Sequence, residues 1–290
     1  MKELLDPVFL QKLERLQMLS RRVQSRGPAS PGDRQTRTKG RSVEFAEHRE
    51  YRPGDDLRHL DWNAFGRLER LYLKLFVEER EQTLTLLVDG SASMESKTLF
   101  SRRLAASLAY VALSSYDRVA LGWVGDRLYD YQPPLRGRSR ITNALRFLAA
   151  HQCRGATDLD AALTDYSRRH GRPGMVVVLS DFFQESAGLE GLKRIRFEKN
   201  ELHVIQILSP DELEPDLSGD LKLVDVETGA GRELTMTRRL VENYQQALAE
   251  HCQRISDWCR RYGCGYVRSR TDIELEQLVL STLRQSGMLR

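Results

Sequence analysis

Short apolar strands alternate with amphipathic helices from residue 83 onward, and this alternation constrains the fold more than any other feature. Strands are expected at the apolar runs 83–89, 118–124, 175–181, 202–208 and 265–268. Helices are expected at 99–115, 141–151, 159–170, 190–198, 237–262 and 273–284. Strands that are joined through such helices need crossover connections, and these build a mainly parallel sheet. Because the strands are almost continuously apolar, we predict that helices cover both faces of the sheet in a doubly wound α/β fold.

The amino-acid composition is that of a folded protein. Hydrophobic residues make up 40% of the 290 residues, which is ample for a folded core. No apolar run approaches the roughly 18 residues of a membrane helix, and the charged N-terminus does not resemble a signal peptide. The four cysteines lack the spacing of a zinc site or a disulfide framework, so we expect free thiols in a cytoplasmic protein.

Residues 1–26 are predicted to form an amphipathic helix. Asp6 can cap the first N–H groups of this helix, and Pro7 suits its first position. The apolar residues of one face are Leu5, Phe9, Leu13, Leu16, Leu19 and Val23. A helix with such a face must pack against another part of the molecule.

A basic linker is predicted at residues 27–42. Between Arg21 and Arg41 there are seven basic residues and one acidic residue, with Gly-Pro and Pro-Gly breaks. This stretch accounts for the net charge of +4, since the rest of the chain is slightly acidic. We expect a solvated linker, and the alternative is an arm that binds anions.

Residues 43–82 form a segment that is dense in polar and turn-forming residues. Its central residues are Arg49, Tyr51, Arg52, Pro53, Gly54, Asp55, Asp56, Arg58, Asp61 and Trp62. The Pro-Gly pair suits a type II turn, and residues 71–77 suit a strand. We expect the charged residues to form an ion-pair network that fixes the segment on the domain at 83–290, with the tryptophan as an anchor. A surface for docking a partner is the alternative.

Oxygen-bearing side chains gather at the expected carboxyl edge of the sheet. Asp89, Ser91 and Ser93 come at the end of the first strand, Asp181 ends the most apolar strand, and Thr157 lies in a neighbouring loop. Doubly wound sheets bind ligands beyond the carboxyl ends of their strands. Because hydroxyl and carboxylate oxygens are ligands for hard cations, we predict a site for Mg²⁺, or for Mn²⁺ or Ca²⁺, and not for zinc.

Two other interpretations of these residues stay open at the level of sequence. The aspartates can cap helices while the serines close a turn. Alternatively, Asp89 can act as the nucleophile of a metal-dependent phosphatase or hydrolase. Against such an enzyme, Ser91 stands where a haloacid-dehalogenase-type phosphatase would carry a second aspartate. A Walker-type phosphate loop is also absent from the sequence.

Residues 83–290 resemble a von Willebrand factor A-type domain. The D-x-S-x-S motif that starts at Asp89, together with Thr157 and Asp181, is similar to the metal-ion-dependent adhesion site (MIDAS) of these domains. The run from Gly40 to Phe45, the pattern from Arg49 to Trp62 and the following D-x-S-x-S-M resemble the bacterial DUF58 family more specifically.

The resemblance implies a Rossmann-type fold like that of the A-type domain. We expect the N-terminal helix and a small β-containing extension to precede this domain. It also implies a partner, because many DUF58 proteins are encoded beside AAA+ ATPases of the MoxR type. Many relatives carry N-terminal membrane helices, whereas this chain has an amphipathic helix and a basic linker.

We therefore expect a non-enzymatic, metal-dependent protein–protein interaction module without catalytic residues. Its expected partner is a MoxR-type ATPase, or a client protein that presents an acidic residue, in protein remodelling or complex maturation. Nucleic-acid binding through the linker and the arginines Arg136, Arg138 and Arg140 is disfavoured, because no aromatic residues are interleaved with them as stacking platforms.

Overall fold

The computed structural model contains two compact units, Met1–Gly27 with Gln82–Arg290 and Pro28–Glu81. It describes residues 4, 6–24, 43–51, 55–56, 60–68, 70–78, 83–115, 118–170, 173–215, 219–224, 231–236 and 238–285. The predicted linker at 27–42 therefore lies outside the described residues.

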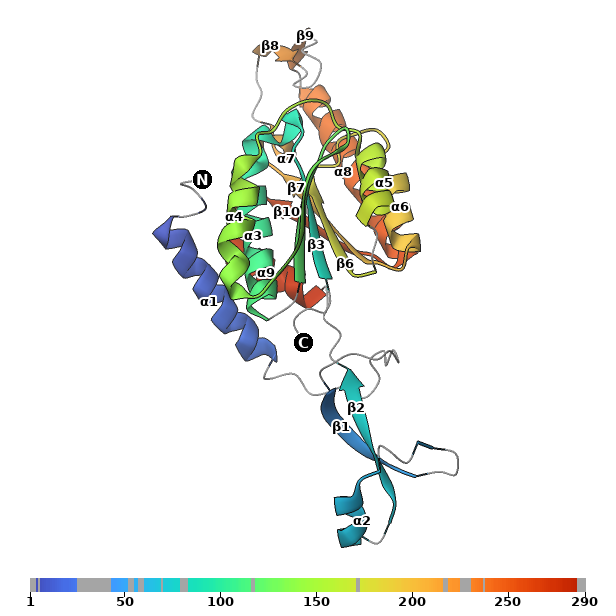
Figure 1. The fold of residues 1–290 in the computed structure, drawn as a ribbon. Coiled ribbons are helices and arrows are strands. Elements are labelled where there is room, and N and C mark those ends of the chain that lie inside the picture. The colour runs from blue at the N-terminus through green and yellow to red at the C-terminus, as the bar shows by residue number, and fades with distance from the viewer. Residues whose placement is uncertain are drawn as a thin grey trace. The chain divides into compact units, whose positions relative to one another are not determined.

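A six-stranded sheet forms the centre of the larger unit (Figure 1). The order of its strands is β10-β7-β6-β3-β4-β5. Its strands are β3 (Thr83–Asp89), β4 (Arg118–Val124), β5 (Leu128–Arg136), β6 (Met175–Ser180), β7 (Glu201–Leu208) and β10 (Gly265–Arg270). Neighbouring strands are parallel except for β4 and β5, which pair antiparallel at one edge. This arrangement confirms the predicted α/β class with a mainly parallel sheet.

Helices cover both faces of the sheet (Figure 1). One face carries α1 (Pro7–Gln24), α3 (Thr98–Ser114), α4 (Ile141–Ala150) and α9 (Leu275–Gln285). The other face carries α5 (Leu159–His170), α6 (Leu189–Phe197) and α8 (Arg238–Tyr262). Each face has its own hydrophobic cluster, and β3 supplies both, since Leu86 and Val88 point into one cluster and Leu87 into the other.

The N-terminal helix α1 belongs to the core of the larger unit. The backbone N–H of Val8 donates to the Asp6 carboxylate at 3.2 Å, which is the predicted cap. Phe9, Leu13 and Leu16 are buried in the same cluster as α3 and α9. The predicted apolar face therefore packs on the domain, and its remaining members, Leu5, Leu19 and Val23, lie outside the described side chains.

Several short elements decorate the larger unit. They are the 3₁₀ helices η2 (Ala92–Lys97) and η3 (Arg138–Arg140), the single turn α7 (Pro210–Leu213), and the hairpin of β8 (Gly219–Val224) and β9 (Gly231–Met236). The second strand of this hairpin begins with glycine and carries two charged residues, so its local pattern is not that of a strand.

The smaller unit is built on the antiparallel pair β1 (Val43–Glu50) and β2 (Tyr72–Glu78), with helix α2 (Trp62–Leu68) between them. Asp61 caps α2 by accepting hydrogen bonds from the N–H groups of Asn63 at 3.0 Å and Ala64 at 3.2 Å. The strand at β2 was predicted, whereas β1 and α2 were missed. Both missed elements are rich in polar residues or weak helix formers, so tertiary contacts and the cap decide their structure.

One pair of the predicted ion-pair network is present in the smaller unit, where Arg49 contacts Asp55 at 2.8 Å. Trp62 packs edge-to-face on Phe65 with ring centroids 6.3 Å apart. The Tyr51 N–H donates to the carbonyl of Leu71, the residue before β2, at 2.9 Å. Four of the central residues lie outside the described part of the chain, namely Arg52, Pro53, Gly54 and Arg58.

All four cysteines are free thiols, as predicted; they are Cys153, Cys252, Cys259 and Cys264. Burial, followed by the neighbouring Cys264, raises the pKa of the Cys259 thiol to about 12. Among the helices that the structure describes, none is both long and apolar enough to cross a membrane.

Leu13→Ala tests the packing of α1 on the larger unit. Leu13 is completely buried, and truncating such a residue lowers the free energy of unfolding by about 2–5 kcal/mol. We expect this loss in urea denaturation followed by tryptophan fluorescence. Lys12→Ala, on the exposed face of the same helix, is the matched control and should shift the free energy by less than about 0.5 kcal/mol. A wild-type midpoint for Leu13→Ala would contradict the packing.

Candidate functional site

The candidate site lies at the carboxyl edge of the sheet, where the strand order reverses. From β3 the chain continues to β4 on one side, and β6 lies on the other side of β3. In doubly wound sheets such a reversal opens a crevice between neighbouring strand ends. Asp89 ends β3 and Asp181 directly follows β6, so the topology brings two carboxylates together that are far apart in the sequence.

Asp89 is a buried carboxylate that the surrounding residues hold in one position. Its side chain is 1% exposed. One oxygen accepts the Ser91 N–H at 2.9 Å, and the other accepts the Ser180 hydroxyl at 2.6 Å. Burial, and then the charge of Asp181, raise the pKa of Asp89 to about 6, although the hydrogen bonds from both serines oppose this shift. A cation beside Asp89 would relieve the repulsion between the two carboxylates.

The hydroxyl groups of Ser91 and Ser93 face each other across 3.1 Å. Ser91 is completely buried, and both serines belong to the tight loop that opens η2. The loop approaches the core so closely that a Cβ on Gly90 would lie 2.3 Å from His151 Nε2. Glycine is therefore required between Asp89 and the serines. The two hydroxyls therefore lie together in one loop at the carboxyl edge of the sheet.

The loop that carries Thr157 lies beside the serine loop. The N–H of Ala92 donates to the Gly155 carbonyl at 3.1 Å, and the N–H of Asp158 donates to the Gly125 carbonyl at 2.9 Å. Thr157 itself is half-buried. These main-chain bonds hold three loops, those after β3, β4 and α4, at the same edge of the sheet.

Asp181 is paired with a buried lysine. Lys97 Nζ donates to Asp181 at 2.8 Å and also to the carboxylate of Glu212, and the lysine side chain is completely buried. The second Asp181 oxygen accepts the Phe183 N–H at 3.2 Å. Burial alone would lower the pKa of Lys97, but attraction to Asp181 and Glu212 outweighs it and raises the pKa above its ordinary value. The ammonium is therefore charged at neutral pH.

Glu212 is fixed by its own turn and by α8. Ser209 and Glu212 form a capping box, in which the Ser209 N–H donates to Glu212 at 2.7 Å and the Glu212 N–H donates to the Ser209 hydroxyl at 3.3 Å. The Tyr244 hydroxyl donates to the Glu212 carbonyl at 2.8 Å. Lys97 belongs to η2, which follows the serine loop, and its contact with Glu212 therefore connects this loop to α7 and α8.

The backbone that follows β6 is strained. Phe182 is buried and has φ of 58°, a left-handed conformation that bulky residues rarely adopt. Its N–H donates to the Ser180 hydroxyl at 2.9 Å, and its carbonyl lies 2.8 Å from the His251 ring nitrogen. Such strain is typical of functional sites, where the surrounding structure enforces it.

Sequence reasoning missed Lys97 and Glu212. Glu212 had a readable signal, since Ser209 and Glu212 have the spacing of a capping box. Lys97 had none, because a lysine before a helix normally lies in solvent and only the fold shows its burial.

The donor atoms of this edge fit a hard cation. Within the described part of the chain, no group of three or more His, Cys, Asp or Glu side chains could hold a metal ion. The edge instead combines a carboxylate, Asp89, with the facing hydroxyls of Ser91 and Ser93. Oxygen donors of this kind suit Mg²⁺, which keeps several of its waters. Asp181 is already compensated by Lys97, so it would add little charge to such an ion.

A family model described as "Protein of unknown function DUF58" matches residues 47–254, which span most of the smaller unit and the whole candidate site. The chain belongs to the DUF58 family. An uncharacterized protein of Mycobacterium tuberculosis is 30% identical over 243 residues, covering 80% of this DUF58 chain and 76% of the relative. An uncharacterized protein of Mycobacterium avium is 34% identical over 116 residues, covering 40% of this chain and 68% of that protein.

Solved structures with similarity to this DUF58 protein include two from Bacteroides. BatB from Bacteroides thetaiotaomicron is 16% identical, with 71% of this chain and 99% of that chain covered and a TM-score of 0.45. An aerotolerance-related membrane protein from Bacteroides fragilis is also 16% identical over the same shares of the two chains, with a TM-score of 0.46.

Asp89→Asn should change the pH dependence of folding stability. The folded-state pKa of about 6 lies above the ordinary value of 3.8. Folding of the wild type is therefore coupled to proton uptake by Asp89 at pH values between these two pKa values. The free energy of unfolding of the wild type should therefore fall by about 2 kcal/mol, relative to the variant, as the pH rises from about 4 to about 7. Urea denaturation in EDTA at a series of pH values measures this difference.

The exposed Asp130 provides the matched control. Asp130→Asn should keep the wild-type pH profile. Parallel profiles for the wild type and Asp89→Asn would contradict the raised pKa of Asp89.

Proposed function

We propose that this DUF58 protein is a non-enzymatic, metal-dependent protein–protein interaction module of the von Willebrand factor A type. The observation that carries the proposal lies at the carboxyl edge of the sheet, where Asp89 accepts the backbone N–H of Ser91 and the hydroxyls of Ser91 and Ser93 face each other in the same loop. In the proposed MIDAS-like site these three residues hold Mg²⁺. Thr157 and Asp181 complete the set from the two neighbouring loops.

The charges around the site support recognition of an acidic partner. Lys97 neutralises much of the Asp181 charge, and the two serines contribute neutral oxygens. A divalent cation held mainly by Asp89 keeps a net positive charge, so it can bind one more anionic ligand. A carboxylate of a second protein is such a ligand, and Ser93 is the partly exposed member of the site that it would approach.

The partner that we propose is a MoxR-type AAA+ ATPase, or a client protein that presents an acidic residue. Membership of the DUF58 family supports this choice through the resemblance described above. In this role the protein acts as an adaptor that couples ATP-driven remodelling to a substrate protein.

The surroundings of Asp89 favour this module over a phosphatase. A haloacid-dehalogenase-type phosphatase carries a second aspartate as general acid two residues after its nucleophile. Ser91 occupies that position here, so Asp89 lacks this acid partner.

Metal-dependent partner binding tests the proposal. Immobilised protein should retain the purified MoxR-type ATPase of the same host in Mg²⁺, and EDTA should weaken retention by roughly tenfold or more, as expected when a charged bridge is lost. Asp89→Ala combined with Ser91→Ala should have the same effect as EDTA. Ser139→Ala, an exposed serine remote from the edge, is the control. Retention that ignores both EDTA and the double variant would refute the metal-bridged interaction.

Lys97→Met should increase the affinity of the site for a divalent cation. Without the ammonium, Asp181 is free of its cationic partner and its negative charge becomes available to the metal. We expect Mn²⁺ to bind at least about tenfold more tightly, or about 1.4 kcal/mol, by electron paramagnetic resonance titration. Lys193→Met on the outer surface of α6 is the matched control. Unchanged or weaker Mn²⁺ binding by folded Lys97→Met would contradict this role of the lysine.

A further inference from the structure

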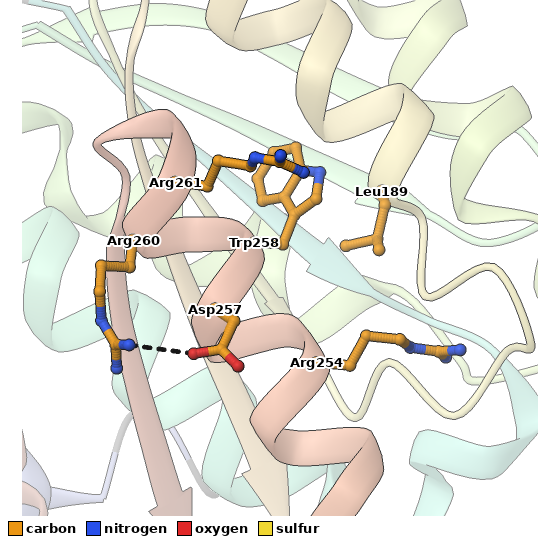
Figure 2. A pocket seen from close by; sticks show the side chains of 6 residues that line it. All are labelled: Leu189, Arg254, Asp257, Trp258, Arg260 and Arg261. Carbon is orange, nitrogen blue, oxygen red and sulfur yellow. Dashed lines mark hydrogen bonds and ion pairs between the residues drawn. The ribbon is translucent and has the colours of Figure 1, made fainter.

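An open groove of about 590 Å³ lies along α8, beside the start of α6 (Figure 2). Its lining residues are Leu189, Arg254, Asp257, Trp258, Arg260 and Arg261. All of them except Leu189 come from α8, and none belongs to the Asp89 site. The groove is therefore a surface separate from the candidate metal site.

The groove carries more positive charge than its own acid can neutralise. Arg260 forms an ion pair with Asp257 at 3.0 Å, on the side of the helix away from Trp258 (Figure 2). Arg254 is positioned by the Glu185 carbonyl at 2.9 Å, a contact that uses only one of its nitrogens. Within the part of the chain that the structure describes, no hydrogen bond or ion pair reaches the exposed guanidinium of Arg261.

An apolar surface lies between Arg254 and Arg261. Trp258 and Leu189 are both half-buried against the hydrophobic cluster of this face. Trp258 also packs on Tyr262, with ring centroids 4.7 Å apart. Tryptophan and arginine are the residues most enriched among those that dominate protein–protein binding energies. A rigid aromatic surface flanked by unneutralised arginines is suited in chemistry to an anionic, partly apolar segment.

The spacing of the arginines fits an extended peptide. Arg254 and Arg261 lie two helical turns apart, about 10 Å along the axis of α8. In an extended polyproline-type peptide, residues three apart point to the same side and are separated by about 9 Å. Two carboxylates at that spacing can reach the two guanidinium groups, while an apolar side chain between them covers Trp258.

We propose that this groove binds an extended acidic segment of a partner protein, with one carboxylate on Arg254, one on Arg261 and an aliphatic side chain on Trp258 and Leu189. A protein segment is favoured over RNA because Trp258 is a single ring, whereas single-stranded RNA binds on a series of stacking platforms. The proposal does not rest on the metal site.

The experiment is fluorescence anisotropy with the labelled peptide Gly-Glu-Pro-Leu-Glu-Pro-Gly and the full chain in EDTA, so that the outcome is independent of any metal bridge. The wild type should bind the peptide. Arg254→Gln combined with Arg261→Gln should weaken binding by about tenfold or more, because both charge-assisted hydrogen bonds are lost. The peptide with glutamine in place of both glutamates should bind equally weakly.

The matched control is Arg140→Gln combined with Arg146→Gln. Arg140 directly precedes α4 and Arg146 lies within it, and both are exposed. The double substitution removes the same charge from another surface. This control should bind the peptide like the wild type. The proposal is overturned by absent wild-type binding, by equal loss in the control, or by binding of the glutamine peptide with wild-type affinity. Preferential binding of oligouridylate through the same arginines would also overturn it, in favour of RNA.

Discussion

The ion pair between Lys97 and Asp181 is the interaction on which the candidate site depends. The topology of the sheet places Asp89 beside Asp181 in a dry environment, and Glu212 closes in from α7. Buried carboxylates without a cation are among the most destabilising arrangements in proteins. Lys97 supplies that cation from within the chain, so the edge can keep its acidic residues in a folded state. This also leaves Asp89 as the carboxylate whose charge is least compensated.

The same edge is tied to the core behind it. Gly90 lets His151 pass directly beneath the serine loop, and His151 stacks between Trp123 at 4.5 Å and Tyr129 at 5.5 Å. The position of the hydroxyls of Ser91 and Ser93 is thus set by aromatic packing and by main-chain bonds to neighbouring loops. A binding site benefits from such rigid support, since a partner then loses little entropy in ordering it.

The sequence was sufficient for the features that local patterns encode. Most strand and helix positions from 83 onward follow from periodicity, with β9 as an exception, and the cap at Asp6 follows from residue type. The sheet edge could also be anticipated, because parallel strands collect their carboxyl ends there. Features set by tertiary context were missed: β1 and α2 have weak local signals, and Lys97 is buried only because the fold offers it two acids. The groove on α8 could not be foreseen, since it needs Leu189 from another helix.

The packing of α1 has a consequence for how the chain is connected. Because α1 and β3 both belong to the larger unit, the smaller unit is an insertion whose two ends return to the same body. A module tethered at both ends keeps a high effective concentration near its host, unlike a tail held at one end. The insertion also makes every contact between α1 and α3 non-local. Closing that loop adds an entropic barrier, so docking of α1 is expected to be a late step in folding.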